Sequence, residues 1–132
     1  MTLAAAVLQV AQLDPYQNPD LPFADRITSP SGKVVVEPCI IRSFAVCPIC
    51  QARTNDGAVI VRHQDGRTVE FWPMLYHYVR ANHPIPIGKD GTLNWEHADG
   101  GNMAAGEMHR PWPQMPGDRQ AITLLPEIMQ DA

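Results

Sequence analysis

The sequence predicts a small α+β protein in which a β-hairpin and a short helix form the centre, between long irregular N- and C-terminal arms. Three observations lead to this fold class. Two β-prone runs flank the turn-forming pair Asp65-Gly66. Apolar residues at helical spacing follow Pro73. The chain of 132 residues contains 13 prolines, about twice the average share, which disfavours long regular helices elsewhere.

We expect the chain to divide into three parts. Residues 1–32 should form an N-terminal helix and an extended arm, and residues 33–88 should form the ordered core. Residues 89–132 are rich in Gly, Pro and Met and show little periodicity, so we expect an irregular C-terminal arm. The stretch 120–130 near its end fits either a strand or a short helix.

The N-terminal part begins with an apolar segment over residues 2–13, which fits one short packing helix that Asp14-Pro15 ends. The segment is too short to span a membrane, and it lacks the positive region of a secretory signal. Residues 14–32 contain four prolines and many turn formers. This composition predicts an extended and irregular segment that lies across a surface, its own or a partner's.

The core begins with a β-rich run over residues 33–47, which Pro38 interrupts. We expect a turn over residues 51–57, because this stretch is rich in polar turn formers and ends in glycine. Residues 58–72 then carry the hairpin, which has the strongest local signal in the chain.

A two-residue turn at Asp65-Gly66 fixes the register of this hairpin. It would pair Ile60 with Phe71, and it would place Ile60, Val69 and Phe71 on one face of the sheet.

A short helix follows the hairpin over residues 73–84. Pro73 suits the first position of a helix, Asn82 can close it, and Pro84 prevents its continuation. The residues that repeat at helical spacing are Leu75, Tyr78, Val79 and Asn82.

Cysteine and histidine residues are spaced as C-x2-C, 26 residues, and H-x5-H across this core. Cys47 and Cys50 form the short pair, His77 lies in the predicted helix, and His83 follows the end of that helix. Two thiolates and two imidazoles are a common donor set for structural zinc. The sequence therefore predicts a Zn²⁺ site that staples the hairpin to the helix.

The helix must end early for this site to form. Residues six positions apart on an ideal helix are rotated by about 240° from each other, so His77 and His83 would face different directions. A left-handed residue near Asn82 would turn His83 back toward the cysteines.

Other interpretations of these residues stay open. Cys47 and Cys50 would also fit a redox pair or two ordinary buried thiols. The ligand types do not distinguish zinc from iron. The residues that could replace a proposed ligand are Cys39, which we expect to be a core thiol, His63, which we expect at the surface, and His97 and His109.

A C-x2-C knuckle, a hairpin and a helix follow one another in this order, which resembles the zinc-finger architecture. The number of residues between the two ligand pairs exceeds that of the DNA-reading C2H2 finger. The motifs "CPIC" and "WPMLYHYVRANH" also resemble small uncharacterised bacterial and phage proteins that pair CPxC with WP-x3-HYV-x3-H. This resemblance covers about residues 44–88 and implies no activity.

The net charge and the absence of certain motifs limit the classes of function that this protein can have. The net charge is −4 and the sequence pI is about 5.6, whereas nucleic-acid binders are usually basic. The zinc-deaminase, HExxH, GxSxG and Gly-lysine phosphate-loop motifs are absent, so we expect no enzyme. The three cysteines do not indicate a disulfide scaffold, which favours a reducing, cytoplasmic location.

We therefore expect a zinc-stabilised structural or interaction protein. It would be an accessory subunit that uses its terminal arms to contact protein partners in a larger assembly, including a phage virion. The alternative is a nucleic-acid-binding protein of the zinc-finger type. The residues that would contact nucleic acid or a partner are Arg53, Arg62, Arg67, Arg80 and Trp72.

Overall fold

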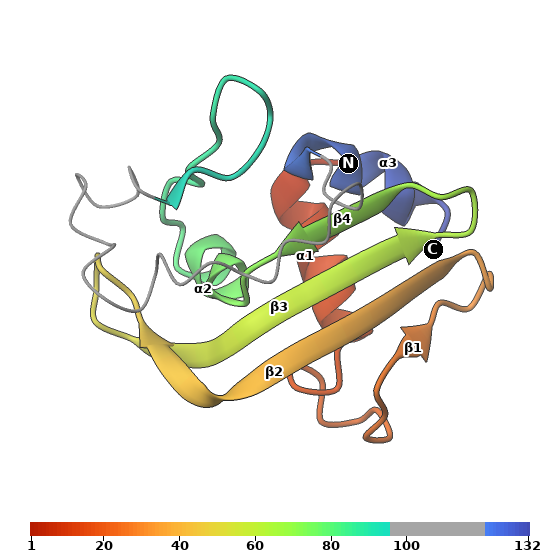
Figure 1. The fold of residues 1–132 in the computed structure, drawn as a ribbon, viewed down its shortest axis with the longest axis horizontal. Helices are drawn as coiled ribbons and strands as arrows, with labels where there is room; N and C mark the ends of the chain where they lie inside the picture. The colour runs from red at the N-terminus through yellow and green to blue at the C-terminus, as the bar shows by residue number, and fades with distance from the viewer. Residues whose placement is uncertain (96–120) are drawn as a thin grey trace.

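A four-stranded antiparallel sheet with the order β1-β2-β3-β4 forms the framework of the protein (Figure 1). The computed structural model describes residues 1–95 and 121–132. The strands are β1 (Ile27–Thr28), β2 (Val34–Val46), β3 (Arg53–His63) and β4 (Thr68–Phe71). The helices are α1 (Leu3–Gln12), α2 (Met74–Arg80) and α3 (Leu125–Gln130), and a short 3-10 helix, η3 (Ile122–Leu124), precedes α3. The predicted α+β class is confirmed.

Strands β2 and β3 form the longest pairing, which runs from Val34 opposite His63 to Val46 opposite Arg53. The turn expected over residues 51–57 is therefore shorter, because most of that stretch pairs with β2. Gly57 has a φ of +132° in this pairing, and a Cβ there would lie 2.4 Å from a backbone oxygen. Only glycine fits this close approach of the two backbones.

The β3–β4 hairpin has a three-residue loop rather than the predicted two-residue turn. The N–H of His63 donates to the carbonyl of Arg67 at 2.8 Å, and Gly66 takes a φ of +99°. A glycine of positive φ at the third loop position is typical of such loops. The predicted register is wrong by one residue, since Ile60 lies opposite Glu70 and not opposite Phe71.

The main hydrophobic core joins both ends of the chain to the sheet. Helix α1 contributes apolar residues at helical spacing, and η3 with α3 contributes a second such set. The buried residues from these segments are Ala6, Val7, Val10, Ala11, Ile122, Leu125, Ile128 and Met129. The helix predicted over residues 2–13 is present as α1, and residues 122–130, in the stretch for which a strand or a short helix was expected, are helical.

A buried carboxylate holds the segment after α1 against α2. Asp14 accepts hydrogen bonds from the N–H of Tyr16 at 2.9 Å and from the hydroxyl of Tyr76 at 2.8 Å. Burial raises the pKa of Asp14, and these two donors and the charge of Arg80 act in the opposite direction. The same segment contacts α2 again where Arg80 donates to the side chain of Gln17 at 2.6 Å.

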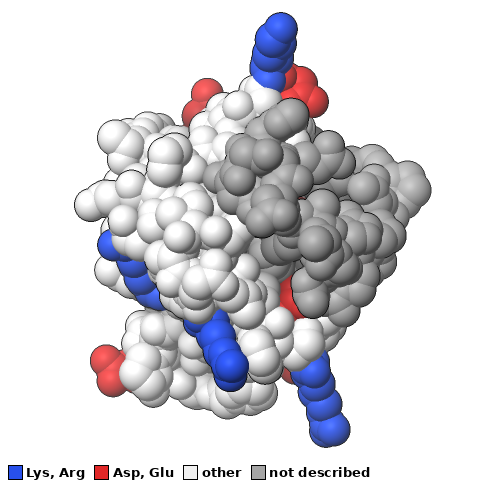
Figure 2. Space-filling view, turned by 90° about the vertical axis from the view of Figure 1, so that its left-hand side faces the viewer, with Lys and Arg blue, Asp and Glu red and all other residues white. Residues whose placement is uncertain are grey.

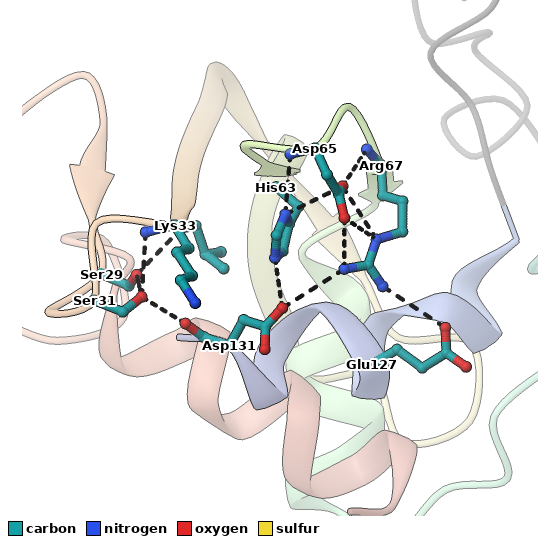
Figure 3. A network of polar contacts seen from close by, with 9 residues as sticks. Ser29, Ser31, Lys33, His63, Asp65, Arg67, Glu127 and Asp131 are labelled. Atoms are coloured by element: carbon teal, nitrogen blue, oxygen red, sulfur yellow. Dashed lines mark hydrogen bonds and ion pairs between the residues drawn. The ribbon is translucent and has the colours of Figure 1, made fainter.

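A polar network fastens α3 to the β3–β4 hairpin (Figure 3). Nε2 of His63 lies 2.7 Å from Oδ2 of Asp131, and Arg67 pairs with Asp65 at 2.8 Å and approaches Glu127 to 3.7 Å. Hydrogen bonds from Arg67 lower the pKa of Asp65. His63 is buried, so its predicted surface position is wrong, because the C-terminal helix covers it.

The core position of α1 predicts unequal effects for two neighbouring substitutions. Val7 is fully buried, whereas Leu8 is 40% exposed on the same helix. Val7→Asp buries an unpaired charge and should lower the free energy of unfolding by more than about 3 kcal/mol. Leu8→Asp should lower it by less than about 1 kcal/mol. Urea unfolding of both variants measures the difference, and equal stabilities would contradict the core position of α1.

The Asp14–Tyr76 hydrogen bond predicts that Tyr76→Phe destabilises the protein by about 1–3 kcal/mol, because a buried acceptor loses its donor. The matched control is Tyr16→Phe. Tyr16 is 40% exposed, so this substitution should change the stability by less than about 0.5 kcal/mol. Thermal and urea unfolding provide the measurement. A Tyr76→Phe protein with wild-type stability would show that this bond does not anchor the segment.

Candidate metal centre

Four side chains converge where the β2–β3 connection meets the end of α2. They are Cys47, Cys50, His77 and His83, and one potential ligand atom from each lies within 4.8 Å of all the others. The structure thus brings together the four residues that the sequence analysis selected as ligands. They come from two segments, the knuckle of residues 47–52 and the end of α2 with the turn that follows it.

The knuckle is a tight turn held by its own backbone. The N–H of Gln51 donates to the carbonyl of Cys47 at 2.9 Å, and the N–H of Cys47 donates to the carbonyl of Ala52 at 2.7 Å. Gln51 takes a φ of +67°, which reverses the chain into β3. The N–H of Ile49 lies 3.4 Å from Sγ of Cys47. Such an N–H group stabilises negative charge on a ligating sulfur.

The end of α2 returns His83 toward the knuckle, as predicted. Asn82 has a left-handed φ of +57°. The N–H of His83 donates to the carbonyl of Tyr78 at 2.9 Å, and the N–H of Asn82 donates to that of Val79 at 3.3 Å. This pair of bonds is the Schellman motif of helix ends. It brings the ring centroids of His77 and His83 to 5.2 Å from each other.

The four candidate ligand atoms lie close enough together to surround one metal ion. Ligand atoms around zinc with two sulfurs and two nitrogens lie about 3.3–3.8 Å apart, by the usual bond lengths. Sγ of Cys50 and Nε2 of His77 lie 3.1 Å apart, close to this range. Nε2 of His83 is buried and has no hydrogen-bond partner among the described residues. The four residues could therefore hold a metal ion.

The environment of His77 also favours the form that ligates metal. Burial lowers the pKa of His77, and the neighbouring His83 lowers it further. A lowered pKa favours the neutral imidazole, whose free nitrogen can coordinate an ion. Cys47 is fully buried, Cys50 is exposed, and both histidines are half-buried, so the cluster lies near the surface of the described part of the chain.

A second, smaller hydrophobic cluster supports the site. It contains Ala45, Cys47, Trp72, Met74 and Tyr78, with Ala52 and Trp95 packed against it. The rings of Tyr78 and His83 lie edge to face at 5.2 Å, so the cluster also contacts a proposed ligand.

Asp56 connects this cluster to an irregularity in β2. Its carboxylate accepts from Nε1 of Trp72 at 2.8 Å and from the hydroxyl of Ser43 at 2.8 Å. Ser43 lies where the register shifts between Ile41 and Phe44. The sequence analysis missed Asp56, because its role depends on a bulge that leaves no clear signal in the sequence.

The alternative ligands lie elsewhere in the fold. Cys39 is exposed in β2, so its predicted role as a core thiol is wrong. The buried side chains that precede it in the strand, Val34, Val36 and Pro38, occupy the opposite face. His63 belongs to the network with Asp131. His97 and His109 lie outside the described residues.

The five predicted contact residues separate into two groups. Arg62 approaches Glu37 to 3.8 Å and Arg67 pairs with acidic residues, both at the hairpin end of β3. Arg53 lies at the other end, about 30 Å away by strand geometry. Arg80 extends from the end of α2. Trp72 is only 5% exposed, so its ring is not accessible for stacking on a base.

Comparison of the chain with protein-family models, curated proteins and solved structures found no match. The resemblance to small bacterial and phage proteins therefore stays a prediction. Among the described residues, no helix has the length and apolar character needed to cross a membrane.

The site predicts different outcomes for two cysteine substitutions. Cys47→Ser removes a ligand, so we expect loss of bound metal and destabilisation by about 4 kcal/mol or more. Cys39→Ser should retain the metal, because Cys39 lies outside the cluster. Metal content and thermal unfolding with and without chelator measure both effects. Loss of metal in Cys39→Ser, or its retention in Cys47→Ser, would overturn the ligand set.

Proposed function

We propose that Cys47, Cys50, His77 and His83 bind one structural zinc ion, and that the protein is an interaction subunit of a larger protein assembly. The convergence of four protein ligands carries this proposal. Structural zinc sites are closed by four such ligands, whereas catalytic sites keep one position for water or substrate. A closed site stabilises a fold and performs no chemistry of its own.

The donor set is one that structural zinc sites commonly use. Two thiolates and two imidazoles in a tetrahedron suit Zn²⁺, which has no redox chemistry and no strong geometric preference. The ion would connect two segments that are separated by 26 residues of sequence.

Exposed apolar side chains around the knuckle support the interaction role. Phe44 is 51% exposed, and Ile41, Val46 and Ile49 are each more than 40% exposed. They lie on β2 and in the knuckle itself, so they concentrate at one end of the sheet. Apolar groups gathered in this way are typical of protein-binding surfaces.

The nucleic-acid alternative has less support. Arg62 and Arg67 contact acidic residues, and the rings of Trp72, Tyr76 and Tyr78 are buried. Single-strand binders need a continuous basic groove and exposed rings for stacking.

An assembly role predicts that the tagged chain, isolated under native conditions from its source cells, forms a complex of fixed stoichiometry heavier than 14.6 kDa. Light scattering after size-exclusion chromatography measures the mass. Combined Phe44→Ser and Val46→Ser should dissociate the complex while zinc stays bound, because it removes apolar contact area.

The control is Phe23→Ser, since Phe23 is 73% exposed in the segment before β1. It should leave the complex intact. A zinc-loaded chain that is monomeric in cell extracts, or a complex that the knuckle variants do not change, would contradict the assembly role.

A further inference from the structure

We propose that a groove beside the metal centre binds an acidic, extended segment of a protein partner. This inference rests on the proposed function and specifies the chemistry of the partner. The groove has a volume of about 460 Å³ and lies between the start of β3 and α2. Its lining includes Phe44, Arg53, Asn55, His77 and Arg80.

Neither arginine that lines the groove forms a salt bridge within 4.0 Å of a carboxylate among the described residues, although the charge of Arg80 acts on buried Asp14. The guanidinium of Arg53 lies 4.5 Å above the ring of Phe44, which supports its flat face and leaves its N–H groups available. Arg80 donates one hydrogen bond to Gln17, and its other N–H groups remain available to a ligand. Arg62 and Arg67, in contrast, contact acidic residues at the far end of β3.

The rest of the lining is suited to an anion. The side chain of Asn55 forms no hydrogen bond within the described part of the chain, and its amide can donate to a carboxylate. Figure 2 shows the side of the molecule that lies on the left in Figure 1, where basic side chains project from the lower half and acidic side chains are also present. A ligand with negative charge complements this surface, since bidentate arginine contacts favour planar carboxylates.

The observations favour a peptide over a nucleic acid. The basic surface of the groove is narrow, and Arg53 covers a face of Phe44 that a base would need for stacking. Phe44 and Val46 are exposed two residues apart on the same strand, so they present an apolar strip beside the charges. An extended segment that alternates acidic and apolar side chains matches both features.

The metal centre would hold one wall of this groove in place. The ring of His77 lines the groove, and its Nε2 also faces Cys50 in the metal cluster. Zinc binding would fix this ring and the orientation of α2 above β3. Peptide binding should therefore weaken when the metal is removed.

The test uses the full-length, zinc-loaded chain and a fluorescent eight-residue peptide in which glutamate and leucine alternate. A matched peptide has glutamine in place of each glutamate. Fluorescence anisotropy should show binding of the acidic peptide and at least about tenfold weaker binding of the glutamine peptide, since each lost charge pair weakens binding. Chelation of the zinc should abolish the difference.

Variants locate the site. The double variant Arg53→Gln and Arg80→Gln should weaken binding of the acidic peptide by about tenfold, while the zinc content stays unchanged. Arg62→Gln is the matched control and should bind like the wild type, because Arg62 lies outside the groove. Equal affinity for both peptides, or a double variant that binds normally, would overturn the inference.

A twelve-nucleotide oligothymidine is the competing probe. Tighter binding of this probe than of the acidic peptide, lost in the double variant, would assign the groove to nucleic acid and would overturn the peptide inference. Zinc is measured on the same samples. A chain that contains no zinc would contradict the proposed structural site. A zinc-loaded chain that assembles with its partner but binds no acidic peptide identifies failure of the groove inference alone.

Discussion

The convergence of Cys47, Cys50, His77 and His83 is the constraint on which this end of the structure depends. Four polar ligand atoms lie within 4.8 Å of one another, and one of them belongs to a fully buried side chain. Buried polar atoms without partners are costly, whereas coordination to one cation would satisfy all of them together. The ion would therefore replace the apolar packing that a short turn and a short helix cannot provide.

The two ends of the sheet are stabilised in different ways. One end has a main core to which both termini contribute helices, and His63 and Asp131 fasten the last helix to the hairpin. Among the described residues, the other end has a smaller cluster around Trp72, supported by Asp56. Helix α2 has seven residues, too few for stability by itself, so its Schellman end is part of what holds it, and a metal ion bound by its candidate ligands would hold it further. The same helix end thus terminates α2 and completes the ligand set.

The sequence was sufficient where local chemistry decides the structure. The spacing of the cysteines and histidines predicted which four side chains come together. Pro73 predicted the start of α2, and Asn82 predicted the left-handed turn that ends it. The sequence was insufficient where contacts between distant segments determine the structure.

Several features depended on such contacts. The one-residue error in the hairpin arose because Gly66 closes a longer loop, and nothing nearby distinguishes the two registers. The exposure of Cys39 and the burial of His63 depend on which strand face the helices cover.

The X-ray absorption spectrum of the purified native protein at the zinc edge would decide whether four protein ligands close the site. We expect a single zinc with two sulfur ligands at about 2.3 Å and two nitrogen ligands at about 2.0 Å. It also predicts no water in the coordination shell. A shell of oxygen and nitrogen without sulfur, an open position occupied by water, or a protein that contains no zinc would contradict a closed structural site.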